Sequence, residues 1–341
     1  MAPVGSYEAL AAAIQAGADS VYFGVGKLNM RSASAANFTL DDLAKIVDTN
    51  DEWIRTRTGI RERRISSGEG TRHLAAKAAE RALAAAGVAP EELDIIILGT
   101  SSPDRNYPSD ACSVQAAIGA VNAVAFDISA ACAGFIFAMN IVEGFFKAGI
   151  YKTALIIGAE TLSKVTDWSD RGTCVLFGDG AGAAVLKAEE TGIIDMMMGA
   201  DGTKGDVLAC TSRTVGNFLT GTKPELGFMT MDGQEVFKFA VRKVPESVME
   251  LLQRTGTKKE DIKYYVLHQA NERIIEAAAR RLKEPMEKFP MTIGQFGNKS
   301  TASIPLLLDD MIQKDMLKRG DKIIMSGFGA GMTWGAVLME W

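Results

Sequence analysis

One cysteine of the chain stands where a catalytic nucleophile could act. Cys132 follows the β-prone run AVAFDIS and precedes AGFIFAMNIVEGFFKAG, an apolar segment that predicts a helix buried in the core. A thiol at the N-terminus of a buried helix feels the positive end of the helix dipole, so we expect a lowered pKa and a favoured thiolate. The alternative is a buried structural cysteine, which is the fate we expect for Cys112, Cys174 and Cys210.

A histidine and an asparagine could complete a catalytic set with this thiol. His268 ends the predicted strand YYVLH, and catalytic groups of open α/β folds gather beyond the C-terminal ends of parallel strands. The other histidine, His73, lies in the first turn of a predicted helix, where a solvated side chain is the common outcome. Asn298 lies in FGNKSTAS, a sequence typical of a turn. It is a candidate catalytic residue only as a third member beside a cysteine and a histidine. Neither histidine has a partner at metal-ligand spacing, so no metal site is expected.

Two further segments could bind or orient a substrate. SGFGAGMTWG, residues 326–335, is a glycine-rich turn that lacks the GKS/T of a phosphate-binding P-loop. Such a bend could instead aim a backbone N–H group at a reacting carbonyl oxygen. Arginines cluster at residues 55–64, which is either a solvated basic stretch or, with Trp53 beside it, part of a nucleotide site.

The composition predicts a large folded core to hold these residues. Of the 341 residues, 47% are hydrophobic and 23% are charged, which excludes a disordered chain. The net charge is −5, so the protein has no overall positive charge that would attract nucleic acid or an anionic membrane. The longest apolar stretch, Ile128–Val142, is shorter than the roughly 20 residues of a spanning helix, and the N-terminus has no signal-peptide pattern. With unpaired thiols, these features predict a cytoplasmic protein without nucleic-acid or membrane partners.

Short apolar runs alternate along the chain with helical patterns. The runs predict buried strands at 91–100, 124–128, 154–158, 264–268 and 322–326. The helical patterns cover 71–86, 112–120, 133–148, 236–255, 271–283 and 304–318. This alternation predicts an α/β fold with helix-covered sheets. Twice a helix ends at a glycine, Gly87 or Gly256, and an acidic turn leads into a buried strand, which suggests two duplicated halves that meet near residues 191–192.

Six motifs in order resemble the β-ketoacyl-acyl-carrier-protein synthase III family, the condensing enzymes that prime bacterial fatty acid synthesis. They are DTNDEWIRTRTGIRERR, FDISAACAGF, RGTCVLFGDGAGAAVL, LHQAN, GNKSTASIPL and GFGAGMTWG. The resemblance runs from about Leu43 to Trp341. It implies a thiolase-like α/β fold of five α-β-α-β-α layers, with duplicated βαβ halves at 43–191, which holds the cysteine, and 192–341, which holds the histidine and asparagine.

The resemblance also implies catalytic roles. Cys132 would be the acylated nucleophile. His268 and Asn298 would complete a Cys-His-Asn triad and bind the malonyl thioester carbonyl during decarboxylation, with the histidine neutral. The backbone N–H groups of Cys132 and Ala330 would form the oxyanion hole.

The resemblance also implies residues that contact the substrates. In the coenzyme A site, Trp53 and Arg171 would stack on the adenine, Arg57 would lie near the phosphates, and Asn271 would lie along the pantetheine channel. For the acidic carrier protein they are Lys238, Arg273, Arg280 and Arg281. Phe328 would lie next to the active site, and Tyr107 would reach across a dimer interface into the partner's acyl pocket. The implied partners are therefore an acyl-CoA substrate, an acyl carrier protein and a second copy of the chain, with no cofactor.

The implied activity is a decarboxylative Claisen condensation of an acyl-CoA, most commonly acetyl-CoA, with malonyl carrier protein. One alternative is a related acyl-CoA-dependent condensing enzyme of polyketide or other secondary metabolism. A papain-type hydrolase fits the triad but not the sequence around Cys132. A third alternative is an inactive fusion or scaffold, because the start of the chain is unusual.

Residues 1–42 depart from the synthase family and resemble the start of the collagenase-like peptidase family. The opening strand of the synthases, expected to be central in its sheet, is absent. Ser20–Gly26, SVYFGVG, is the only β-prone run upstream of Leu43 that could take its place. A smaller departure is Lys299, where the family usually has threonine.

Overall fold

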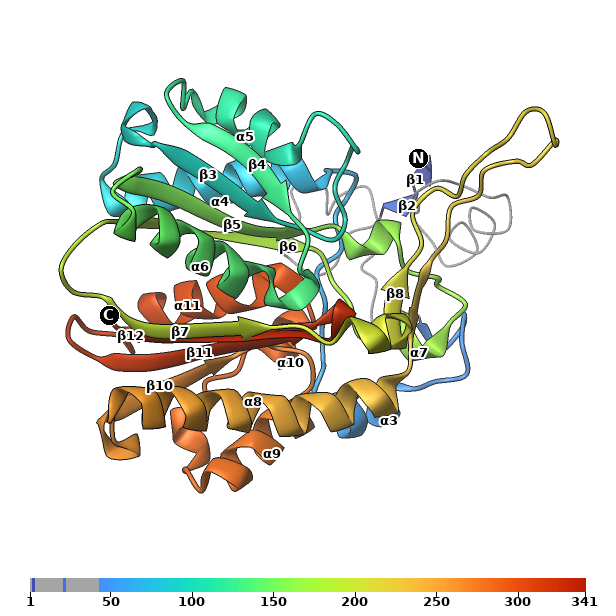
Figure 1. Cartoon of the computed structure of the whole chain (residues 1–341). Helices are drawn as coiled ribbons and strands as arrows, with labels where there is room; N and C mark the ends of the chain where they lie inside the picture. Colours follow the sequence, from blue (N-terminus) through green and yellow to red (C-terminus); the bar gives the residue numbers. More distant parts are fainter. Residues whose placement is uncertain (1, 4–20, 23–42) are drawn as a thin grey trace.

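The protein contains two four-stranded mixed sheets, with helices on both faces of each sheet (Figure 1). The structure, a computed structural model, describes residues 2–3, 21–22 and 43–341. The first sheet has the order β4-β3-β5-β6, with β3 Ile95–Gly99, β4 Val124–Ile128, β5 Thr153–Glu160 and β6 Gly180–Lys187. The second has the order β10-β11-β12-β7, with β7 Ile193–Gly199, β10 Ile262–Leu267, β11 Lys322–Gly329 and β12 Thr333–Glu340.

Helices separate and cover the two sheets in five layers, as the resemblance implied (Figure 1). The outer layer on the first sheet holds α4 Thr71–Ala86 and α5 Asp110–Ile118. The central layer holds α6 Gly134–Lys147 and α11 Ser303–Gln313, whose apolar side chains form one core with both sheets. The outer layer on the second sheet holds α8 Gly233–Thr255 and α9 Glu272–Leu282. Three short helices complete the described helices: α3 Asp51–Thr58, α7 Arg171–Cys174 and α10 Ile293–Phe296.

The two halves repeat the same order of elements. Helix α4 ends at Gly87, where φ is 62°, and α8 ends at Gly256, where φ is 68°. Glycine adopts this left-handed conformation without the strain that a Cβ would add. A single acidic 3₁₀ turn then leads from each glycine into the buried strand β3 or β10. The duplicated pattern predicted from the sequence is therefore present in the structure.

The halves differ at one sheet edge. In the second sheet β7 pairs antiparallel with the outer edge of β12. Among the described residues no strand pairs with the corresponding edge of β6. A groove of about 1710 Å³ instead runs along β6 between α4 and α11, lined by residues such as Arg81, Gly182 and Leu306. Because β7 is an edge strand, the equivalent position in the first sheet is also an edge, not the sheet centre.

The prediction that Ser20–Gly26 fills this position is wrong for the two residues of the run that are described. Val21–Tyr22 forms β2, which pairs in parallel with β1, Ala2–Pro3, in a separate two-stranded sheet. Neither of these two residues pairs with β6. The rest of the run lies outside the described residues.

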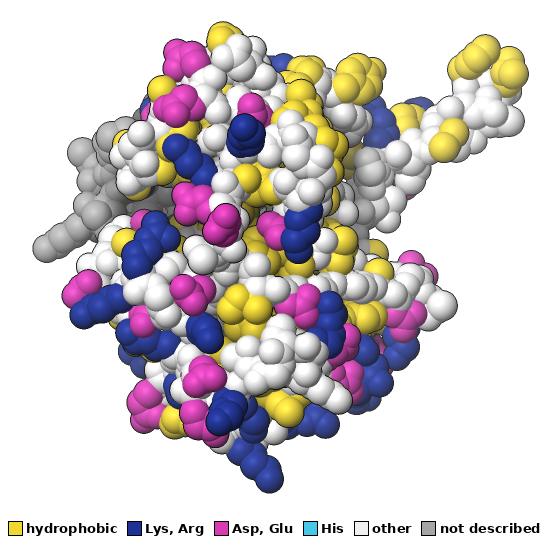
Figure 2. Space-filling view, turned by 60° about the vertical axis from the view of Figure 1, so that its left-hand side comes forward, with side chains coloured by type: hydrophobic (Ala, Val, Ile, Leu, Met, Phe, Trp, Pro, Cys, Tyr) yellow, Lys and Arg dark blue, Asp and Glu magenta, His cyan; other side chains and the backbone are white. Residues whose placement is uncertain are grey.

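An arm projects from the body between β8 Leu208–Cys210 and β9 Met229–Met231 (Figures 1 and 2). Its two sides are joined by backbone hydrogen bonds from Thr214 to Glu225 and from Asn217 to Thr222. Phe218, near its tip, is 91% exposed. No helix in the described part of the chain has the length and apolar character needed to cross a membrane.

Candidate active site

Cys132 lies in a 3₁₀ turn, Ala131–Ala133, between β4 and α6. Ala131 has a φ of 45°, an uncommon conformation for a residue with a Cβ. Two threonine hydroxyls hold the turn, since Thr301 donates to the carbonyl oxygen of Ala131 at 2.8 Å and Thr333 donates to that of Ala130 at 3.2 Å. The strained turn is therefore fixed from two distant parts of the chain, and strain of this kind often marks functional sites.

The predicted lowering of the Cys132 pKa is wrong. The pKa of this thiol is raised to about 12, mainly by burial and also by the nearby carboxylate of Glu160. The nearby Ser300 hydroxyl acts in the opposite direction without overcoming burial. The cost of placing a thiolate in a dry interior outweighs the field of the helix terminus. At neutral pH this environment favours the protonated thiol over the thiolate.

His268 follows β10 and is held against β11. Its backbone N–H donates to the carbonyl oxygen of Ser326 at 2.8 Å, and its ring lies edge-on to Phe328 with centroids 5.2 Å apart. The ring is buried, and its Nδ1 has no partner. Burial lowers the pKa of His268 to about 3. The imidazole is therefore neutral at physiological pH, as the sequence analysis expected.

Asn298 is presented by the turn that follows α10. Its backbone N–H donates to Leu176 at 3.0 Å and its carbonyl accepts from Gly178 at 2.9 Å, so the turn is tied to the segment before β6. The side-chain Oδ1 accepts from the backbone N–H of Ser300 at 2.8 Å. With its oxygen engaged, the Asn298 amide can offer its N–H₂ group to a substrate.

The end of β11 meets the Cys132 turn at close range. A Cβ on Gly329 would lie 2.6 Å from the backbone nitrogen of Cys132, so only glycine fits there. Ala330, the next residue, starts the 3₁₀ turn Ala330–Met332. The structure therefore brings together the segments that carry the two expected oxyanion-hole groups.

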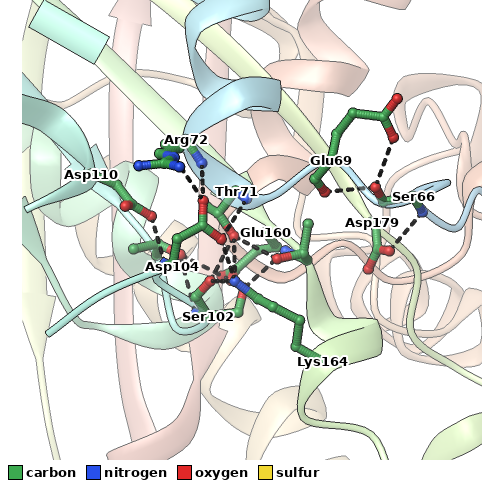
Figure 3. Close-up of polar contacts among 12 residues, drawn as sticks. Ser66, Glu69, Thr71, Arg72, Ser102, Asp104, Asp110, Glu160, Lys164 and Asp179 are labelled. Carbon is green, nitrogen blue, oxygen red and sulfur yellow. Dashed lines mark hydrogen bonds and ion pairs between the residues drawn. The ribbon is translucent and has the colours of Figure 1, made fainter. Parts of the chain in front are cut away.

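Behind the turn lies a buried carboxylate that the sequence analysis did not identify. Glu160 ends β5 and is fully buried (Figure 3). It accepts hydrogen bonds from the Ser102 hydroxyl at 2.6 Å, the Ser101 N–H at 3.0 Å and the Thr301 hydroxyl at 3.0 Å. The sequence feature that marks it is an acidic residue at the C-terminal end of an apolar strand, in TALIIGAE.

The residues expected to contact coenzyme A form one surface cluster. The Arg171 guanidinium lies 5.1 Å, and that of Arg57 5.9 Å, from the centre of the Trp53 ring. Arg171 also donates to the carbonyl oxygen of Asp48 at 2.8 Å. The Asn271 amide donates to the carbonyl oxygen of Arg57 at 3.0 Å and caps α9. An aromatic ring with two guanidinium groups is suited to a ligand that has a flat ring and phosphates.

The expected carrier-protein residues lie exposed on α8 and α9, which pack against each other. They are Lys238, Arg273, Arg280 and Arg281. Lys238 and Arg280 have acidic neighbours one turn away on their own helices, at 2.8 and 3.6 Å. Phe328 is buried against His268, and Tyr107 is 86% exposed.

Comparisons with known proteins show the family of this chain. The family profile described as 3-oxoacyl-[acyl-carrier-protein (ACP)] synthase III matches residues 126–202, and its C-terminal counterpart matches residues 252–341. The β-ketoacyl-[acyl-carrier-protein] synthase III of Clostridium novyi is 53% identical over 305 residues, which cover 89% of this chain and 94% of that protein. The chain belongs to the β-ketoacyl-[acyl-carrier-protein] synthase III family. The family protein of Clostridium acetobutylicum is 52% identical over the same share of both chains.

Solved structures show the same fold. The synthase III of Aquifex aeolicus matches with a TM-score of 0.83 and 47% identity, over 89% of this chain and 95% of that one. The priming β-ketosynthase of the R1128 polyketide pathway matches with a TM-score of 0.81 and 34% identity, over 89% of this chain and 92% of that one. Residues 5–54 match a different profile, peptidase family U32, in line with the resemblance found for the start of the chain. Within the described residues, no group of three or more His, Cys, Asp or Glu side chains could hold a metal ion.

Proposed function

We propose that the protein is an acyltransferase that condenses an acyl-CoA starter, acetyl-CoA in the first instance, with malonyl-acyl carrier protein. The meeting of the Cys132 turn with the end of β11 and with the turn that follows Asn298, together with a buried neutral His268 beside Phe328 of β11, supports this reaction. A thiol can carry the acyl group, while two neutral hydrogen-bond donors suit an enolate oxygen.

The reaction has two halves. In the first, the Cys132 sulfur attacks the acyl-CoA carbonyl, and the backbone N–H groups of Cys132 and Ala330 stabilise the oxyanion. Coenzyme A leaves and the acyl group stays on the sulfur. In the second, the malonyl thioester loses CO₂, and His268 and Asn298 donate to the enolate oxygen. The enolate carbon attacks the acyl group, frees the thiol and gives the β-ketoacyl carrier protein.

Surface features support the substrate assignments. The cluster of Trp53, Arg57, Arg171 and Asn271 would bind coenzyme A, as the ring and guanidinium stacking favours. The basic surface on α8 and α9 would receive the acidic carrier protein by charge complementarity. Tyr107 would complete the acyl pocket of a second copy, which makes a homodimer the functional unit. We infer no metal or other cofactor, and the cytoplasmic location stays a prediction.

A direct assay tests the proposal. Purified, size-fractionated protein is mixed with acetyl-CoA and malonyl carrier protein, and the β-ketoacyl carrier protein and CO₂ are measured. The proposal predicts both products with the parent protein and neither with Cys132→Ser. Absence of product with the folded parent protein would support the inactive-scaffold alternative.

A second candidate function rests on the 34% identity to a polyketide priming β-ketosynthase. The same chemistry would then act on a different starter or carrier. Competition between acetyl-CoA and longer or branched acyl-CoAs, at equal concentration, separates the two functions by the starter that is consumed.

A further inference from the structure

The Thr301 hydroxyl lies close to two other oxygens but has a single proton. Its Oγ1 is 2.8 Å from the carbonyl oxygen of Ala131 and 3.0 Å from Oε1 of Glu160. A carbonyl oxygen only accepts hydrogen bonds, and so does an ionised carboxylate. If Glu160 were ionised, one of these two short oxygen–oxygen contacts would have no proton between its atoms and would be repulsive.

The Thr301 side chain is packed so that its hydroxyl stays near both oxygens. A Cβ on Gly99 would lie 2.7 Å, and one on Gly134 3.0 Å, from the Thr301 methyl carbon Cγ2. The methyl group is thus wedged between β3 and the start of α6. Because a β-branched side chain has few allowed χ1 rotamers, a fixed methyl group also fixes Oγ1.

The other oxygen of Glu160 is already supplied with donors. Oε2 accepts from the Ser102 hydroxyl at 2.6 Å and from the Ser101 N–H at 3.0 Å. The Ser102 oxygen in turn accepts from the Thr161 N–H at 2.9 Å, so its own proton is free for Glu160. A proton on Glu160 therefore belongs on Oε1, where the Thr301 oxygen accepts it.

Within the described part of the chain, no positively charged side chain forms an ion pair with Glu160. The Lys164 ammonium group is 2.7 Å from the Ser102 carbonyl oxygen, but it pairs with Asp104 at 2.7 Å (Figure 3). Burial raises the pKa of the Glu160 carboxyl, which favours its neutral form. An ionised Glu160 would raise the pKa of the Cys132 thiol, and a neutral one removes this opposition to the thiolate.

The Ala131 carbonyl and the Cys132 N–H belong to one peptide unit. Because a trans peptide is planar, its carbonyl and N–H bonds point in opposite directions. The hydrogen bond from Thr301 to this carbonyl therefore sets the direction of the Cys132 N–H, the expected oxyanion donor. Ala131 needs such support, since its φ of 45° is uncommon for a residue with a Cβ.

We propose that Glu160 is a neutral carboxylic acid that acts through Thr301 to position the Cys132 turn for acylation. The inference deepens the proposed function and rests on it. The Oε1–H group of Glu160 donates to the Thr301 oxygen, and the Thr301 hydroxyl donates to the Ala131 carbonyl. Glu160 and Thr301 are positioning residues, because they act on the reaction through the peptide between Ala131 and Cys132.

The first test separates the hydroxyl of Thr301 from its methyl group in the full-length protein. Acylation of Cys132 by acetyl-CoA is followed in a single turnover. Thr301→Val keeps the methyl contacts and should slow acylation at saturating acetyl-CoA about 100-fold, the usual cost of a displaced oxyanion donor. The acetyl-CoA concentration that gives half the maximal rate should not change. Thr301→Ser keeps the hydroxyl and should restore the parental rate, although its melting temperature should fall.

Two variants of Glu160 separate a neutral donor from a negative charge. Glu160→Gln offers an N–H₂ group to Thr301 and should acylate like the parent, a rescue that a need for the charge would not allow. Glu160→Leu has no donor and should be slower than Glu160→Gln by about tenfold, the value of one net hydrogen bond.

Infrared spectroscopy measures the protonation of Glu160 without any substrate. At pH 7 the difference spectrum between the parent and Glu160→Gln should show the carbonyl band of a protonated carboxyl group. Glu143→Gln is the matched control, because Glu143 pairs with Lys147 at 3.1 Å. Its difference spectrum should show only the loss of ionised carboxylate bands.

The inference is overturned by an ionised Glu160 in the infrared spectrum, by parental acylation in Thr301→Val, or by equal losses in Thr301→Ser and Thr301→Val. Equal rates in Glu160→Gln and Glu160→Leu would overturn it too. If Thr301→Val does not fold, the two Glu160 variants and the infrared band still decide. Failure of the parent to react with acetyl-CoA would instead count against the proposed function, and the infrared band would still decide the state of Glu160.

Discussion

Gly329 and Cys132 lie so close that a Cβ on the glycine would come within 2.6 Å of the cysteine's backbone nitrogen. This contact joins the end of β11 to the nucleophile turn. The turn is held by the hydroxyls of Thr301 and Thr333, and Gly329 is held by the pairing of β11 with β12, so movement of either segment would break hydrogen bonds. We propose that the lack of a side chain at Gly329 lets the N–H of Cys132 face a substrate oxygen.

Replacement of Gly329 by alanine should therefore displace one oxyanion donor. We expect Gly329→Ala to lower kcat for condensation about 100-fold, which is the usual cost of losing such a donor. Gly144→Ala is the matched control, because a Cβ there meets nothing within 4 Å. Steady-state kinetics of both variants checks the prediction, and equal rates for Gly329→Ala and the parent would contradict the close contact.

The buried, neutral His268 should make the protein less stable in mild acid. Its folded pKa of about 3 lies below the ordinary 6.5, so below pH 6.5 the unfolded chain binds a proton that the folded protein does not. Above pH 6.5 this contribution disappears. Between pH 7.5 and 5.5 His268 should lower the free energy of unfolding by about 1 kcal/mol. Urea unfolding at both values checks this, and His268→Gln should show a correspondingly smaller pH dependence.

The ring-and-guanidinium cluster should determine affinity for the acyl donor. Arg171→Ala removes the cation nearest Trp53 and should raise KM for acyl-CoA about tenfold, within the range of a cation–π contact plus a phosphate contact. The KM for malonyl carrier protein should stay close to the value of the parent protein. Arg319→Ala is a fair control, since Arg319 lies 5.9 Å from the Trp341 ring in a similar contact elsewhere. Equal KM values for acyl-CoA in the two variants would contradict the proposal that the Trp53 cluster binds coenzyme A.

The basic surface on α8 and α9 should act on the carrier protein alone. Arg273→Glu reverses a charge at its centre and should raise KM for malonyl carrier protein about tenfold, with acylation by acyl-CoA nearly intact. Added salt should weaken the parent's use of carrier protein, because exposed charges are screened within about 10 Å at 0.1 M. Arg81→Glu, the same reversal on exposed α4, is the control. Loss of both half-reactions in Arg273→Glu would point to damage to the fold.

Sequence pattern predicted the elements whose apolar period is clear. The bounds of β4 and α4 agree residue for residue, and Cys132, His268 and Asn298 occur in the turns expected for them. The strands β6 and β7 were missed because GAGAAVLK and IIDMMMG lack the β-branched alternation typical of strands. The unpaired edge of β6 could not be predicted from the hydrophobic pattern of the sequence, because a sheet edge depends on which strands pair with each other.

Long-range contacts account for the errors at the site. The sequence around Cys132 shows only the local helix dipole, whereas burial among segments far apart in the sequence raises the pKa of its thiol. Glu160 and Thr301 are 141 positions apart by their numbering, and no local spacing connects them. Their hydrogen bond forms only when β5 and the turn before α11 are packed together.

Transfer of the acetyl group from acetyl-CoA to one identified cysteine is the direct test of the proposal that Cys132 is the nucleophile. Protein incubated with labelled acetyl-CoA is digested, and the labelled peptide is identified by mass spectrometry before and after addition of malonyl carrier protein. The account predicts label on Cys132 that is lost to product in the parent. In His268→Ala and Asn298→Ala the label should persist, because condensation should fall at least about 100-fold in both. Label on Cys112, Cys174 or Cys210, or label on Cys132 that both variants discharge at the parental rate, would contradict the account.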